Sequence, residues 1–265
     1  MRYLFFIFLT SLISLSSFPQ EKEVITLSNG DTINLLNNKG DRQGYWKLQR
    51  GMVYQAGEYN NGLKEGVWIV YGVGNKPELI EEYKNGKLNG TSILLDGKGK
   101  LRNERHFKNN KLDGINIFYT KEGVIKFKRY YKNGLLQGEY IKYYDNGNKM
   151  EESFYWQGEK DGISTYYNEN ERPIGIYHYK MGILEGNYNS FYNNGIIKTE
   201  KTYINNLAQG FYKEYYENSR IKTEGQFTND KKVGKWIFYT NTGKRLKIQY
   251  WKNGEMTRER VFSSQ

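Results

Sequence analysis

The chain has 265 residues, with 40 Lys or Arg against 29 Asp or Glu, which gives a formal net charge of +11. It contains no cysteine, which excludes disulfides and thiol chemistry. Aromatic residues make up 16% of the chain, which is atypical of disorder, and 29 glycines with only 3 prolines favour tight turns between paired strands.

Residues 1–19 have the layout of a cleavable secretory signal peptide. Arg2 is their only charge, and an uncharged, mostly apolar run from Leu4 to Leu15 follows it. This run is short for a membrane span but typical of a signal peptide. We therefore expect export to the periplasm, the cell surface or the medium.

The positive charge has two interpretations. In an exported protein it favours an acidic protein partner, an anionic envelope polymer or lipid headgroups, rather than nucleic acid. Alternatively, the lysines line solvated strand faces and protect sheet edges from aggregation.

An internal repeat organises the rest of the chain. Its anchor is a glycine that recurs after 22 residues and then after every 24 residues. The anchors are Gly44, Gly66, Gly90, Gly114, Gly138, Gly162, Gly186, Gly210 and Gly234. A constant period of this length indicates an array of identical supersecondary units.

Other residue types keep the same register. Seventeen residues after the anchor, the modules carry Tyr83, Phe107, Tyr131, Tyr155, Tyr179, Tyr203, Phe227 and Trp251. Two residues after it, Trp46, Trp68, Tyr140, Tyr188, Tyr212 and Trp236 recur, and Ser92, Asn116 and Ser164 break the pattern. A turn pair such as Asn61-Gly62 precedes most anchors, and Asn and Gly tolerate the positive φ of tight hairpin turns.

These patterns predict an all-β fold, an elongated antiparallel β-meander of stacked hairpin repeats with a 24-residue period. In one module we expect strands over 139–144 and 149–156, a turn at 145–147, and a connection over 157–161 to the next anchor. We expect a capping hairpin over 20–43, the repeat array over 44–252 and a capping strand over 253–265. Alternation puts apolar residues on both faces, so either both faces are partly covered or one is an open aromatic surface.

No residue pattern indicates catalysis or a cofactor. His106 and His178 lie three modules apart, too far to share a metal, and no Gly-x-Ser-x-Gly motif is present. Glu104, Glu152, Glu200 and Glu224 fill one recurring position, which predicts a ladder facing lysines. Residues 97–100, Gly-Lys-Gly-Lys, have no following helix and are expected to form a turn. We expect no enzyme, no metal and no cofactor.

A family resemblance adds to this interpretation. The segment Tyr131-Lys132-Asn133-Gly134-Leu135-Leu136-Gln137-Gly138-Glu139-Tyr140, with Tyr143-Tyr144 and Asp145-Asn146-Gly147, resembles the variant MORN repeat of bacterial proteins of the YwqK antitoxin type. The resemblance covers roughly residues 40–260. It implies a sheet of stacked hairpins that binds proteins or, in some MORN proteins, lipids, and an antitoxin-like role.

We therefore expect a non-enzymatic, exported scaffold that binds another envelope or secreted protein. The candidate binding residues lie five positions after the anchors: Tyr71, Tyr119, Tyr143, Tyr167, Phe191, Tyr215 and Tyr239. Tyrosine gives a large contact area at low entropic cost, although the same residues could simply hold the hairpins together. The alternative function is a module that binds cell-wall glycan or anionic lipid through an aromatic and basic sheet face. The sequence leaves the oligomeric state open.

Overall fold

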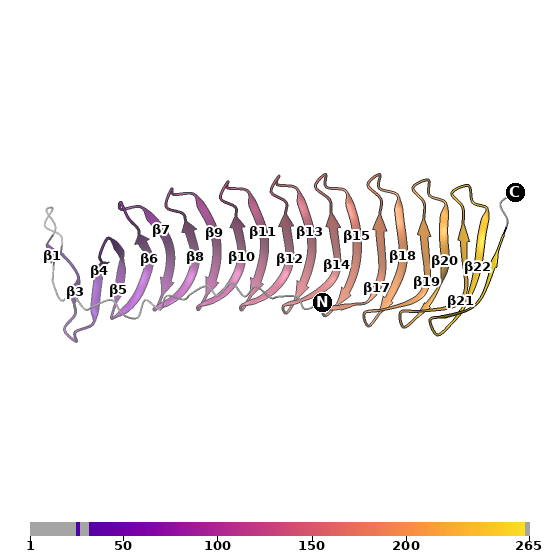
Figure 1. The fold of residues 1–265 in the computed structure, drawn as a ribbon. Helices are drawn as coiled ribbons and strands as arrows, with labels where there is room; N and C mark the ends of the chain where they lie inside the picture. The colour runs from indigo at the N-terminus through magenta and orange to yellow at the C-terminus, as the bar shows by residue number, and fades with distance from the viewer. Residues whose placement is uncertain (1–24, 27–31, 263–265) are drawn as a thin grey trace. The chain divides into compact units, whose positions relative to one another are not determined.

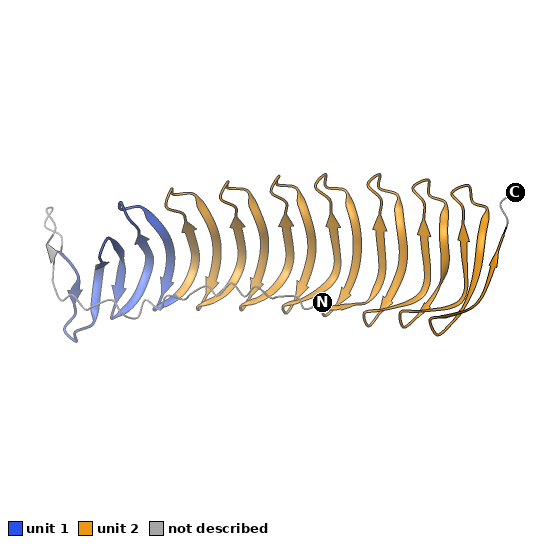
Figure 2. Cartoon of the chain, viewed as in Figure 1, with its two compact units in different colours: residues 1–87 blue, residues 88–265 orange. Residues whose placement is uncertain are grey.

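The computed structural model describes residues 25–26 and 32–262. The predicted signal peptide lies outside these residues and stays a prediction. The chain divides into two compact units, residues 1–87 and residues 88–265, which Figure 2 shows in different colours.

The first unit is an antiparallel meander that begins with very short strands. β1 (Ile25–Thr26) pairs with β2 (Thr32–Ile33), as predicted for the starting hairpin, whose turn lies outside the described residues. The remaining strands pair in chain order. They are β3 (Leu35–Leu36), β4 (Arg42–Arg50), β5 (Val53–Asn60), β6 (Leu63–Tyr71) and β7 (Pro77–Lys84).

The second unit is one open antiparallel sheet of sequential hairpins, which confirms the predicted fold class (Figure 1). From β8 to β15 each strand pairs with the next in the chain, β15 pairs with both β16 and β17, and from β17 on each strand again pairs with the next. The strands are β8 (Lys87–Leu95), β9 (Leu101–Lys108), β10 (Lys111–Tyr119), β11 (Ile125–Lys132), β12 (Leu135–Tyr143), β13 (Lys149–Trp156), β14 (Glu159–Tyr167), β15 (Pro173–Lys180), β16 (Ile183–Leu184), β17 (Gly186–Phe191), β18 (Ile197–Ile204), β19 (Leu207–Tyr215), β20 (Ile221–Thr228), β21 (Lys231–Tyr239), β22 (Arg245–Lys252) and β23 (Glu255–Val261).

The predicted turn pairs form two-residue hairpin turns. Asn133 and Gly134 have φ values of 50° and 89°, and positive φ at both central positions matches the right-handed twist of the flanking strands. Where glycine is missing from the second position, the chain uses another residue that tolerates positive φ. These residues are Asn110, Asn206 and Asp230.

The first strand of each module begins earlier than predicted. β12 starts at Leu135 rather than at residue 139, and β14 starts at Glu159, inside the segment predicted as a connection. The cause is a β-bulge at the anchor: the pairing jumps from Tyr131–Leu136 to Arg129–Tyr140, and Gly138 adopts a φ of 93°. The anchor glycine therefore lies within a strand and not before one.

Hydrogen bonds join the tight turns of successive modules. The Gly134 N–H donates to the Leu112 carbonyl at 2.7 Å, and the Gly158 N–H donates to the Leu136 carbonyl at 2.9 Å. The residue before the anchor also takes part, since the Asp113 carboxylate accepts the N–H of Asn133 at 3.2 Å. This bond lowers the pKa of Asp113. The acidic residues that precede the anchors therefore fix the next turn in place.

Aromatic side chains fill one face of the sheet, here called the core face. In the first unit, Trp46, Leu48, Tyr59 and Trp68 are buried together, with Tyr83 packed against them. The second unit repeats this arrangement: the Phe227 ring lies 5.0 Å from Trp236 and 5.5 Å from Tyr212. The Lys232 ammonium lies over the Trp236 ring, 4.2 Å from its centre, in a cation–π contact.

The opposite face, here called the outer face, is only partly covered. It buries Ile141 and Ile248, which are 6% and 7% exposed, but leaves the Phe211 side chain 73% exposed. The sequence left open whether both faces are partly covered or one face is an open aromatic surface. In the structure both faces are partly covered, and the aromatic side chains of the core face are packed against one another.

Side-chain volumes are matched between neighbouring modules on the core face. A Cβ atom on Gly225 would come within 2.2 Å of the Trp236 ring, and one on Gly57 within 2.5 Å of Trp68. In the module that begins at Gly90, Ser92 replaces the aromatic residue, and its cross-strand partner is Arg105 instead of glycine. The Arg105 guanidinium donates to the Ser92 hydroxyl at 3.1 Å. Close packing therefore explains why serine and asparagine interrupt the aromatic pattern.

Candidate functional site

The seven predicted binding residues occupy equivalent positions, each at the end of the first strand of its module. All seven are half-buried. Three of them donate a hydroxyl hydrogen bond to a glutamate of the same sheet: Tyr167 to Glu152 at 3.0 Å, Tyr215 to Glu200 at 2.5 Å, and Tyr239 to Glu224 at 2.6 Å. These tyrosines therefore hold the sheet together, and a role in binding a partner stays a prediction.

The glutamates of this recurring position thus face tyrosine hydroxyls as well as lysines. Burial, and then the hydrogen bond to Glu200, raise the pKa of the Tyr215 hydroxyl to about 12. The same two causes raise the pKa values of Tyr167 and Tyr239. Each phenol stays protonated and acts as a hydrogen-bond donor, which holds the carboxylate in one orientation.

These pKa shifts make stability fall at high pH. Below the ordinary tyrosine pKa of about 10, both the folded and the unfolded chain keep these phenols protonated. Between pH 10 and about 12 only the unfolded chain ionises, so the free energy of unfolding should fall as pH rises through this window.

Urea unfolding measured across this pH range, with phenolate absorbance as the second readout, tests the prediction. Tyr215→Phe should make the fall in stability shallower. A folded chain whose phenols titrate at the same pH as those of the urea-unfolded chain would contradict it.

Exposed apolar side chains gather beside the tight turns of four consecutive hairpins in the second unit. We call this group the apolar strip. Its members and their exposed fractions are Leu135 52%, Trp156 46%, Met181 45%, Ile183 39%, Ile204 45% and Leu207 39%. The turns are hydrogen-bonded in series, and a Cβ on Gly158 would lie 3.9 Å from the Leu135 side chain. The apolar side chains therefore follow one another along four consecutive hairpins. Glu159 interrupts them in the second hairpin, where it is exposed at the position that Leu135, Ile183 and Leu207 occupy in the others.

Lysines border the apolar strip at equivalent turn-flanking positions. Lys108 pairs with Lys111 across the turn on one side of the strip, and Lys231 and Lys252 occupy these positions on the other side. The strip is not evident from the repeat pattern, because the residues at these positions are not constant along the repeat. A run of apolar residues at one position in consecutive modules is the signal that could have found it.

Two hollows flank the exposed Phe211 ring on the outer face. The larger, of about 490 Å³, is lined by Asn187, Asn189, Glu200, Lys201, Thr202, Phe211, Lys213 and Glu224. The smaller, of about 260 Å³, lies on the β19–β21 side and shares Phe211, Lys213 and Glu224 with it. The larger hollow has a size typical of small-molecule sites.

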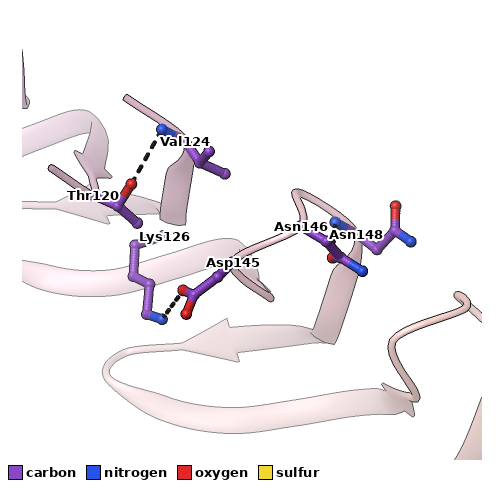
Figure 3. A network of polar contacts seen from close by, with 6 residues as sticks. All are labelled: Thr120, Val124, Lys126, Asp145, Asn146 and Asn148. Atoms are coloured by element: carbon purple, nitrogen blue, oxygen red, sulfur yellow. Dashed lines mark hydrogen bonds and ion pairs between the residues drawn. The ribbon is translucent and has the colours of Figure 1, made fainter. Parts of the chain in front are cut away.

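A third hollow, of about 220 Å³, lies at the wider turn between β12 and β13, residues 144–148. At its edge the Lys126 ammonium pairs with the Asp145 carboxylate at 2.8 Å (Figure 3). The side-chain amides of Asn146 and Asn148 both donate to the Glu169 carbonyl. These polar groups therefore connect one wide turn to the next.

The ring of each histidine is hydrogen-bonded to a main-chain carbonyl group. Nδ1 of His106 lies 3.1 Å from the Ile115 carbonyl oxygen, and Nδ1 of His178 lies 2.7 Å from that of Asn187. Over residues 25–26 and 32–262, no group of three or more His, Asp or Glu side chains could hold a metal ion. In the same part of the chain, no helix has the length and apolar character needed to cross a membrane.

The repeat was then compared with known proteins. Residues 112–133, 136–157 and 184–205 match the family model of the MORN repeat variant. At three positions, this chain carries MORN repeat variants. The first two matches start one 24-residue period apart and the third starts two periods later, so all three are in the register of the anchors. Repeats of this family are generally non-catalytic and often mediate interactions. A search of curated proteins finds no match.

Proposed function

We propose that this chain is a non-enzymatic scaffold that binds another protein through the apolar strip. The supporting observation is that six large apolar side chains stay exposed on four consecutive hydrogen-bonded hairpins. A contiguous apolar patch with a polar border is typical of a protein interface. An antitoxin-like role would be one form of this binding, with a toxin as the partner.

The strip has the features of an interface that binds at low entropic cost. Trp156 lies within it, and tryptophan is enriched among the residues that contribute most to binding energy. The strip lies on strand ends and two-residue turns, which are already ordered before a partner arrives. Little backbone freedom would therefore be lost on association.

The charges around the strip define the partner's chemistry. Six exposed lysines border the strip or lie along it, against two exposed glutamates, Glu159 and Glu255, at the same turn-flanking positions. The lysines are Lys108, Lys111, Lys132, Lys180, Lys231 and Lys252. A complementary partner presents an apolar patch with an acidic rim, and its association rate falls with added salt. We propose an envelope or secreted protein as this partner, because residues 1–19 have the signal-peptide pattern.

The experiment compares two variants of the chain expressed from residue 20. Trp156→Asp with Leu207→Asp places two charges in the strip. Leu246→Asp is the matched control, because Leu246 is 42% exposed and lies on β22, outside the strip. Proteins captured from envelope and secreted fractions by the wild type and the control should be depleted by about tenfold or more with the double variant.

Hydrogen exchange on the complex with a captured protein gives the second readout. Amides around the four tight turns should be protected when the partner is bound. Capture that is equal for all variants, or that enriches no protein reproducibly, would refute the proposal.

An anionic lipid surface is the second candidate. Tryptophan and aliphatic side chains bordered by lysines also suit the interface of an anionic membrane. Sedimentation with vesicles of phosphatidylglycerol and phosphatidylcholine separates the two cases. Salt-sensitive binding that the double variant loses, together with no captured protein, would favour the lipid.

A further inference from the structure

The larger outer-face hollow lies over β17–β20 and is built from two cross-strand rows. Asn189, Glu200, Lys213 and Glu224 are direct partners on successive strands, and so lie on the same face. Asn187 pairs with Thr202 in a second row. Short polar side chains at positions 187 and 189 leave the space that the hollow occupies.

Both carboxylates in the hollow are held in place from outside it. The Tyr215 hydroxyl donates to Oε2 of Glu200, and the Tyr239 hydroxyl donates to Oε1 of Glu224. Within the described part of the chain, the second oxygen of each carboxylate makes no hydrogen bond. Each glutamate therefore presents one oriented acceptor that remains available to a ligand.

Donors lie between and beside these acceptors. Lys213 is the cross-strand partner of both Glu200 and Glu224, yet it makes no ion pair within 4.0 Å among the described residues. The Asn187 amide oxygen accepts the Thr202 hydroxyl at 3.4 Å, which leaves its amide N–H groups for a ligand. The hollow thus combines donors and acceptors at short spacing.

Phe211 adds an apolar platform to this polar site. Its side chain is 73% exposed, the highest value among the aromatic side chains that the structure describes. It stands between the two hollows and lines both of them. A phenyl ring exposed among amides and carboxylates can stack against the C–H face of a sugar ring, while the sugar hydroxyls reach the polar groups around it.

We propose that this hollow binds a neutral glycan, with one sugar ring stacked on Phe211. Vicinal hydroxyls both donate and accept, so they match the paired Glu200 and Glu224 acceptors and the Lys213 and Asn donors. A polyanion gains no net charge attraction from two carboxylates that lie beside Lys213, and an apolar ligand would leave the polar groups unpaired. The site shares no residue with the apolar strip and does not depend on the proposed protein partner.

Calorimetric titration of the chain from residue 20 tests the site with cellotetraose and chitotetraose as neutral probes and tetragalacturonate as the acidic probe. At least one neutral probe should bind saturably, with millimolar or tighter affinity, and more tightly than the acidic probe. Phe211→Ala should lower this affinity by about tenfold or more, without unfolding the chain, because the ring is exposed.

Phe154→Ala is the matched control. Phe154 is 49% exposed on β13, and it lines neither outer-face hollow. Its removal should leave the affinity within about twofold, whereas Tyr215→Phe should lower it by an intermediate amount because Glu200 loses the bond that orients it. The Trp156→Asp, Leu207→Asp variant should bind the glycan normally, which separates this test from that of the protein partner.

Three results would overturn the glycan site. The first is that no neutral probe binds saturably, and the second is that Phe154→Ala and Phe211→Ala weaken binding equally. The third is that Phe211→Ala abolishes capture of a protein while no probe binds, which would assign the hollow to a protein interface.

Discussion

Replacing Gly225 by valine should destabilise the second unit by about 1–3 kcal/mol or more, as expected for overpacking of a filled core. The Trp236 ring is 1% exposed and lies directly over Gly225, so that a Cβ would approach its atoms to 2.2 Å. Valine otherwise suits a strand, and Gly225 does not have the positive φ that favours glycine. The expected loss therefore comes from the steric contact alone.

A compensating variant tests this explanation. Ser153 and Ser164 are 3% and 1% exposed at the equivalent positions three modules earlier. Gly225→Ser should lower the free energy of unfolding less in a Trp236→Ser background than in the wild type. The two changes should therefore not be additive in urea unfolding. Additive losses, or a stable Gly225→Val protein, would contradict the volume match between modules.

Trp68→Ala should destabilise the first unit by about 3–5 kcal/mol, the usual cost of removing a large buried aromatic side chain. Trp68 is 2% exposed, its ring lies 4.9 Å from that of Tyr59, and its indole N–H donates to the Glu58 carbonyl at 3.0 Å. The Lys64 ammonium lies 4.1 Å from the same ring. Alanine would leave a cavity at the centre of a small core, and the Glu58 carbonyl would lose the hydrogen bond from the indole.

Trp156→Ala provides the control for this loss. Trp156 is 46% exposed in the apolar strip, so its removal should change the free energy of unfolding by no more than about 0.5 kcal/mol. Hydrogen exchange resolved to peptides would show that Trp68→Ala opens strands β4–β7. Equal effects of the two substitutions would mean that burial does not determine the stability of the first unit.

The two proposed sites have different physical bases. The apolar strip uses hydrophobic area bordered by lysines at the tight turns. The Phe211 hollow uses oriented polar groups in the middle of the outer face. A repeat sheet can carry both because each module contributes side chains at fixed positions while their identity varies from module to module.

The sequence alone determined the hairpins and their period. Two-residue hairpin turns require positive φ, which Asn133-Gly134 and its equivalents tolerate, and the glycine period sets the module length. These are local constraints of the backbone, so no knowledge of distant contacts is needed to read them. The resemblance of residues 131–147 to the MORN repeat variant agrees with the three matched segments.

Only the tertiary structure decided which side chains are exposed and available to a ligand or partner. Alternation assigns residues to two faces, but burial depends on the volume of the cross-strand neighbour, as the pairs Gly225–Trp236 and Ser92–Arg105 show. The bulge at Gly138, the bond from Asn133 to Asp113 and the exposure of Phe211 all depend on residues of a neighbouring module. A repeat pattern states what the modules share, whereas a binding site arises where one module differs from its neighbours.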